Sequence, residues 1–113
     1  MARPEEQRQY PRFHAAAWIE CPLLSASPFP AEDVSAGGFR ALLTHKPREG
    51  HPYQVNLRVG DSAFGPCKAL VAWCQEQAQQ PGLWAFGMLV MMGDEEREAL
   101  TATLEETTAV VRA

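Results

Sequence analysis

Two short groups of side chains near the start of the sequence have the types and spacing that suit a small anion. Arg8 and Arg12 lie four residues apart in a polar segment, and Asp33 and Ser35 precede Gly38. A guanidinium group presents two parallel N–H donors that match the oxygens of a phosphate. The chemistry that these residue types indicate is the binding of an anionic ligand.

Each group also has a simpler interpretation. Paired arginines in a polar arm usually form a solvated tail. An Asp-x-Ser-x-x-Gly segment before a strand usually forms a turn, in which Asp and Ser accept hydrogen bonds from nearby backbone amides and Gly supplies an unusual φ. To choose between an anion site and a solvated tail followed by a turn, the strands and helices that carry these residues must be predicted.

The strands are predicted from alternation and from turn residues. Apolar and polar residues alternate over 53–59, which is typical of a strand with one buried face. Residues 22–32 contain three prolines and are expected to form a loop. The predicted strands cover residues 13–21, 37–43, 53–59, 67–74 and 83–92. Because the last of these is apolar on both faces, we expect both of its faces to be covered.

One helix is predicted at the end of the chain. Asp94 is a good N-cap, and Glu95 and Glu96 place carboxylates in the first turn, where they favour the helix dipole. Leu100 and Leu104 share one helical face, so an amphipathic helix is expected over about 94–112. We predict a flexible arm over 1–12 and a single domain over 13–113, a small antiparallel barrel or sandwich with a terminal helix.

Composition excludes several classes of protein. The chain has 113 residues and 46% hydrophobic content, which is enough for the core of one domain. Its net charge of −4 argues against a broad basic surface for DNA or RNA. The acidic excess lies in residues 94–113, where six carboxylates stand against two arginines. A local anion site near the N-terminus is compatible with this distribution.

The three cysteines and the absence of catalytic motifs help to predict where the protein is located and whether it is an enzyme. An odd number of cysteines and a polar N-terminus predict free thiols in a reducing cytoplasm. The longest apolar run, 83–92, is too short to cross a membrane as a helix, so we expect no membrane association. The sequence has no spacing typical of a metal site and no nucleophile–base pair. We therefore expect neither a metal, a cofactor nor an enzyme.

Taken together, around the first predicted strand, the two groups resemble the PilZ domain family. That family is marked by R-x-x-x-R followed by D/N-x-S-x-x-G, and the matching residues here are Arg8, Arg12, Asp33, Ser35 and Gly38. Residues 69–73, which end in a tryptophan, and 82–87 are similar to later strands of the family. The resemblance covers nearly the whole chain. It implies a six-stranded antiparallel β-barrel with a C-terminal α-helix.

The resemblance also implies a ligand, the bacterial second messenger cyclic di-GMP. Arg8 and Arg12 are then expected to bind its phosphates or the acceptor edge of guanine. Asp33 is expected to accept from guanine N–H groups, Ser35 to add a hydrogen bond, and Gly38 to allow a base or a backbone partner to approach. Relatives with a further arginine before the first motif tend to hold two ligand molecules, so Gln7 favours one.

The function that follows is a stand-alone cyclic di-GMP receptor whose arginine arm orders over the ligand and signals to a partner protein or through a homodimer. The alternative is a PilZ-fold adaptor that binds proteins without nucleotide. An oligonucleotide-binding barrel is disfavoured by the charge of −4. Trp73, Trp84 and Phe86 can stack on bases, but aromatic strand residues more often belong to the core. Arg40 and Arg58 are expected to face solvent.

Overall fold

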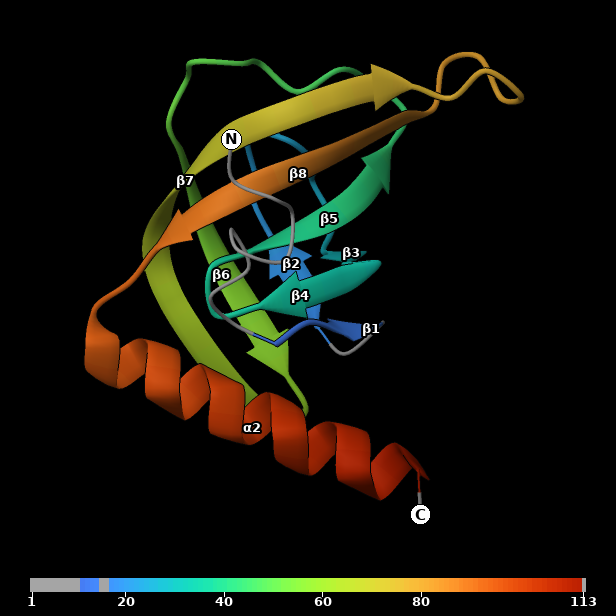
Figure 1. Cartoon of the computed structure of the whole chain (residues 1–113). Helices are drawn as coiled ribbons and strands as arrows, with labels where there is room; N and C mark the ends of the chain where they lie inside the picture. The colour runs from blue at the N-terminus through green and yellow to red at the C-terminus, as the bar shows by residue number, and fades with distance from the viewer. Residues whose placement is uncertain (1–10, 15–16, 113) are drawn as a thin grey trace, which may run out of the picture.

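A curled antiparallel sheet with one long helix across its end forms the fold in the computed structural model, which describes residues 11–14 and 17–112 (Figure 1). The strands run in the order β1-β4-β5-β8-β7-β6-β2-β3. Their bounds are β1 Phe13–His14, β2 Trp18–Glu20, β3 Phe29–Pro30, β4 Asp33–Ser35, β5 Gly38–Leu43, β6 Tyr53–Val59, β7 Ser62–Glu76 and β8 Trp84–Met91. The helix, α2, covers Asp94–Arg112.

The predicted fold class is confirmed, and the strand count differs from the expected six. The predicted first strand, 13–21, contains the separate strands β1 and β2. The expected loop at 22–32 contains β3, and the expected turn at Asp33 is itself the strand β4. These elements are two or three residues long, which is too short for an alternating pattern to reveal them.

The core lies on the concave side of the sheet. Tyr53, Val55, Leu57 and Val59 of β6 are buried, as their alternation predicts. The rings of Phe29, Phe39 and Phe86 meet with centroids 6.2–6.5 Å apart. Leu100 and Leu104 of α2 are fully buried, which confirms the predicted helix face. The helix therefore closes one end of the curled sheet, beside β4, β6 and β7 (Figure 1).

The first turn of α2 is tied to β7 by a side chain. Glu96 accepts a hydrogen bond from the backbone N–H of Gly65 through Oε2 at 2.9 Å. The backbone N–H of Arg97 donates to the carbonyl of Gly93 at 3.0 Å, which begins the helical hydrogen bonds. In the part of the chain that the structure describes, no helix combines the length and the hydropathy that a membrane span needs.

Among the described residues nothing covers the outer face of β8, contrary to the expectation that both faces of this apolar strand are covered. Phe86, Met88 and Val90 point into the core, but Leu89 is 55% exposed and Met91 is 44% exposed. The reason is the position of α2, which packs across the end of the sheet and leaves the outer side of β8 uncovered (Figure 1). An exposed apolar strip therefore borders the site described next.

Candidate ligand site

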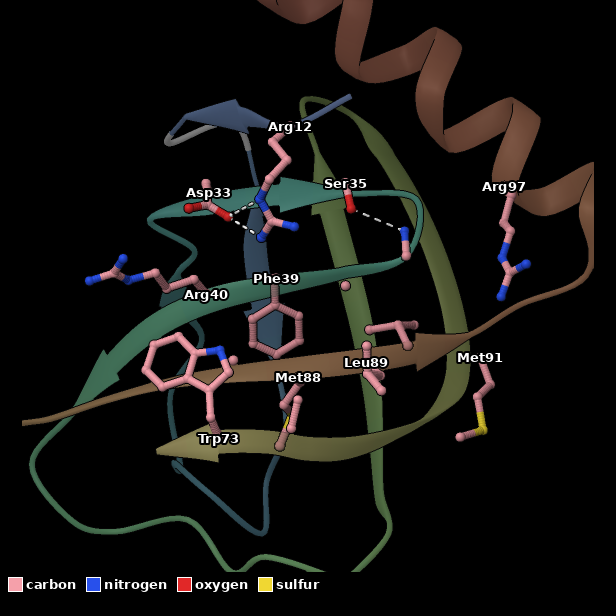
Figure 2. A pocket seen from close by; sticks show the side chains of 15 residues that line it. Arg12, Asp33, Ser35, Phe39, Arg40, Trp73, Met88, Leu89, Met91 and Arg97 are labelled. Atoms are coloured by element: carbon pink, nitrogen blue, oxygen red, sulfur yellow. Dashed lines mark hydrogen bonds and ion pairs between the residues drawn. The ribbon is translucent and has the colours of Figure 1, made fainter. Parts of the chain in front are cut away.

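A pocket of about 560 Å³ crosses the outer side of β5, β8 and β7 (Figure 2). We call it the β5–β8–β7 pocket. It extends from Arg12, which directly precedes β1, to Arg97 in the first turns of α2. Asp33, Ser35 and Gly38 also line it. The structure thus brings four of the five predicted site residues together, and the fifth, Arg8, lies outside the described residues.

An ion pair joins the two motifs at the edge of this pocket. β1 pairs antiparallel with β4, with His14 opposite Asp33, so Arg12 enters the sheet beside that carboxylate. Nε of Arg12 donates to Oδ1 of Asp33 at 2.9 Å, and Nη2 donates to the same oxygen (Figure 2). The pair fixes the plane of the guanidinium group. Because both bonds end on Oδ1, the lone pairs of Oδ2 can still accept from a ligand.

Ser35 and Gly38 build the turn between β4 and β5. The buried Oγ of Ser35 accepts a hydrogen bond from the N–H of Gly37 at 3.1 Å. At Gly38, a Cβ would lie 2.0 Å from the carbonyl oxygen of Met88 in β8. The approach of the two backbones thus requires glycine at this position whether or not a ligand is bound.

The charge of the β5–β8–β7 pocket is opposite to that of the whole chain. Its described lining contains three arginines, at positions 12, 40 and 97, and one carboxylate, Asp33. Arg40, whose Nε lies 3.1 Å from Oε1 of Glu32, is exposed as predicted and also lines the pocket. A concave surface with excess guanidinium groups favours an anionic ligand.

Arg97 lines the β5–β8–β7 pocket, and sequence reasoning missed this residue. Arg97 directly follows Asp94, Glu95 and Glu96, so the sequence suggests only a solvent-exposed side chain on an acidic helix surface. The fold turns its side chain from α2 toward the end of β8 and into the β5–β8–β7 pocket (Figure 2). The only signal in the sequence is a basic side chain in an otherwise acidic first turn.

The aromatic residues divide between core and pocket. Phe86 is fully buried and belongs to the core, as expected. Trp73 is 41% exposed and lines the β5–β8–β7 pocket, so the expectation of a core role is wrong for this residue. The cause is a register shift in β7 between Val71 and Trp73, which breaks the inward–outward alternation.

A second depression lies on the outer side of β2 and β6, and we call it the β2–β6 depression. It measures about 390 Å³ and is lined by Trp18, Glu20, Pro28, Arg58 and Gly60. Trp18 stands directly opposite Arg58 across the strand pair, and Arg58 lies 3.6 Å from Oε2 of Glu20. Its lining holds one cation and one anion, so it lacks the charge excess of the first pocket.

Two of the three cysteines, Cys21 and Cys67, are buried. Burial raises the pKa of Cys67, and the nearby carboxylate of Glu96 raises this pKa further. Burial likewise raises the pKa of Cys21. Both groups are therefore protonated thiols at neutral pH and poor nucleophiles. Among the described residues, no three His, Cys, Asp or Glu side chains group in a way that would hold a metal ion.

Comparisons with known proteins find a matching family model and a similar solved structure. The family model of the PilZ domain matches residues 6–106, which include both motifs. A solved structure of the Bacillus subtilis inhibitor of motility (MotI/DgrA) is similar, with a TM-score of 0.68 and 16% identity. The match covers 100% of this chain and 59% of that one, and at this identity it shows the fold alone. A search of curated proteins finds no match.

Proposed function

The chain belongs to the PilZ domain family, and we propose that it is a cyclic di-GMP receptor that transmits ligand binding to a partner protein. The observation that carries the proposal is the β5–β8–β7 pocket, in which an excess of arginines lies beside Asp33, Ser35 and Gly38. PilZ domain proteins are generally receptors or adaptors rather than enzymes. We therefore propose a binding function without catalysis, exerted in the cytoplasm.

The chemistry of the ligand fits this lining. Cyclic di-GMP carries two phosphodiester groups, each negatively charged, and two guanines with acceptor edges that match a guanidinium fork. In our proposal Arg12, already aligned by Asp33, binds a phosphate or a guanine edge. Asp33 offers Oδ2 to guanine N–H donors, and Ser35 adds a hydrogen bond. The net charge of −4 disfavours a polyanion such as DNA or RNA, which needs a broad basic surface.

The arm that carries Arg8 supplies the proposed response. Residues 1–10 lie outside the described residues, and Arg12 is the point where the arm meets the pocket. Ordering a backbone residue costs about 1–2 kcal/mol. Charge-assisted hydrogen bonds contribute about 1.5–3 kcal/mol each, so a few of them offset the ordering of a short segment. Ligand binding would then fold the arm across the pocket and create a new surface for a partner or a second copy of the chain.

Amide hydrogen exchange tests the response of the arm. With cyclic di-GMP we expect new protection at Gln9, Tyr10 and Arg12 together with residues 35–38. Protection at 35–38 alone would leave the ligand at the pocket but contradict the folding of the arm. Protection confined to α2 would contradict the proposed location of the ligand.

Isothermal titration tests the function itself. We expect one ligand molecule per chain and a Kd in the low micromolar range or below, which corresponds to about 8 kcal/mol. Cyclic di-AMP and GTP serve as matched nucleotide controls and should bind more weakly. If a folded sample gave no heat with cyclic di-GMP at high micromolar concentration, the receptor function would be wrong.

A nucleotide-independent adaptor is the second candidate. The observation that favours it is the exposed apolar strip of Leu89 and Met91 on β8, which a partner protein can cover. The titration separates the two candidates, because an adaptor of this kind needs no nucleotide.

A further inference from the structure

The apolar strip on β8 lies among cations. Leu89 and Met91 point outward, and the residue directly opposite Met91 in the β7–β8 pair is the exposed Lys68. Arg97 lines the same end of the β5–β8–β7 pocket as Met91 (Figure 2). Exposed apolar side chains with a charged rim are typical of interaction sites. Because this rim is basic, it suits a protein surface that is partly apolar and acidic.

The exposed face of α2 has the opposite charge. A depression of about 460 Å³ lies along this helix and is lined by Asp94, Arg97, Glu98, Thr101, Ala102 and Glu105. The three carboxylates are exposed, and they share one side of the helix because their spacings of four and seven residues match whole turns. The exposed methyl group of Ala102 lies on the same side. We call this surface the acidic face of α2.

The apolar strip and the acidic face of α2 meet at Arg97. This residue lines both the β5–β8–β7 pocket and the depression on the helix. A basic and apolar surface therefore directly borders an acidic one. A two-fold axis through such a boundary places each surface of one copy on the opposite surface of the other copy. Both contacts then form at once, and the assembly closes as a dimer.

We propose that two copies of this chain associate in this way, with the acidic face of α2 of each copy covering the apolar strip of the other. A second copy is the favoured occupant because the chain itself supplies both the cations and the carboxylates. A specific interface buries about 800 Å² of each partner. The molecule has extents of 38 × 36 × 28 Å, so one of its faces is large enough.

The net charge of the two copies does not prevent this association. Each chain carries a charge of −4, so two copies repel each other as whole molecules. At physiological ionic strength this repulsion is screened beyond about 8 Å. The attraction between the carboxylates of one copy and the arginines of the other acts at contact distance and is screened much less.

The dimer has a consequence for the ligand, and this part rests on the proposed function. The covered surface includes Leu89, Met91 and Arg97, which also line the β5–β8–β7 pocket. Cyclic di-GMP and the second copy therefore compete for the same surface. Because the ligand then binds only the monomer, it should shift the equilibrium from dimers to monomers.

Sedimentation equilibrium of the full chain tests the dimer. Between about 10 μM and 1 mM the unsubstituted protein should show a monomer–dimer equilibrium. Leu89→Asp places a carboxylate against the acidic face of the partner, and Glu98→Lys reverses a charge on that face, so each should weaken dimerisation by about tenfold or more. Trp18→Ala and Glu20→Lys are matched controls in the β2–β6 depression and should leave the dimer unchanged. Thermal melting verifies that each variant is folded.

Mixing the two weakened variants gives a sharper test. In a heterodimer of Leu89→Asp with Glu98→Lys, the unchanged strip of one copy receives the unchanged helix of the other. At the second contact, the new carboxylate faces the new lysine. The mixture should therefore dimerise more tightly than either variant alone, by about threefold or more. A mixture as weak as the separate variants would contradict the pairing of strip with helix.

Sedimentation with added cyclic di-GMP tests the competition, and the dimer fraction should fall as the ligand concentration rises. A dimer that binds cyclic di-GMP without dissociating would contradict the competition. A monomer throughout the concentration range would contradict the dimer, and isothermal titration would still decide the receptor function. A dimer that the two variants weaken, but that binds no cyclic di-GMP, would support the interface and contradict the receptor function.

Discussion

Two depressions on the outside of the sheet are built from similar parts. The β5–β8–β7 pocket combines Trp73 with Arg40, whose partner is Glu32. The β2–β6 depression combines Trp18 with Arg58, whose partner is Glu20. An exposed tryptophan beside a paired arginine is therefore not what distinguishes a ligand site in this protein.

The two depressions differ in what surrounds this shared arrangement. Only the lining of the β5–β8–β7 pocket adds two more arginines, Arg12 and Arg97, among the described residues. They come from opposite ends of the chain, and Arg12 is aligned by Asp33. Charge gathered from separate elements, rather than any one residue pair, therefore favours an anionic ligand at one place and not at the other.

The largest effect on stability is expected at Gly38, where β5 and β8 approach each other below the pocket. Gly38→Ala would place a methyl group 2.0 Å from the carbonyl oxygen of Met88, so β5 and β8 must move apart. We expect a loss of about 3 kcal/mol in the free energy of unfolding. Gly93→Ala is the matched control, because nothing lies within 4 Å of a Cβ there. Thermal melting of both variants measures the difference, and equal midpoints would contradict the close approach of β5 and β8.

The next effect compares the arginines of the two depressions. Arg12→Ala should weaken cyclic di-GMP binding by about 2 kcal/mol or more, because a charge-assisted hydrogen bond to the ligand is lost. Arg58→Ala should leave the affinity unchanged. The Arg12–Asp33 pair is partly exposed, so the unfolding free energy should fall by less than about 1 kcal/mol. If isothermal titration gave the two variants equal affinities, the claim that the ligand binds in the β5–β8–β7 pocket and not in the β2–β6 depression would be contradicted.

A smaller loss is expected at the helix end of the pocket. Arg97→Gln keeps the length and polarity of the side chain but removes its charge, so cyclic di-GMP should bind more weakly by about 1 kcal/mol. The same substitution at Arg58 is the control. If titration showed an unchanged affinity for Arg97→Gln, Arg97 would not contact the ligand, and the anion would bind only at the Arg12 end of the pocket.

The smallest effect concerns salt. Charges in an open pocket are screened by added electrolyte, so the affinity for cyclic di-GMP should fall as sodium chloride rises from about 0.05 to 0.5 M. The dependence should be shallower in Arg12→Ala, which has one fewer cation near the ligand. A salt-independent Kd would indicate that apolar stacking rather than charge dominates binding.

The sequence was most informative where a pattern repeats over several residues. The alternation over 53–59 and the capped apolar face at 94–112 correspond to β6 and α2. Local residue types were sufficient for these two elements, because strand and helix periods follow from backbone geometry. Arg12, Asp33, Ser35 and Gly38 were singled out by the resemblance to the PilZ domain family, and the fold brings these four residues into the lining of one pocket.

The parts that sequence reasoning missed depend on tertiary structure. The strands β3 and β4 are too short to show a period. Trp73 points outward because of a register shift in β7, and no residue type in the sequence predicts that shift. Arg97 joins the site only because α2 packs across the end of the sheet, and the same packing leaves Leu89 exposed. Each of these features is set by how elements meet rather than by the residues of one element.

The proposed location of the ligand is tested most directly by NMR, which follows the three tryptophan indole N–H signals during titration with cyclic di-GMP. The signal of Trp73 and the amides of residues 35–38 and Gly87 should shift progressively and saturate, while the signal of Trp18 stays in place. Substitution of Trp73 and Trp18 in turn assigns the indole signals. Shifts at Trp18 without shifts at Trp73, or no shifts at all on a folded sample, would contradict the claim that the β5–β8–β7 pocket binds this ligand.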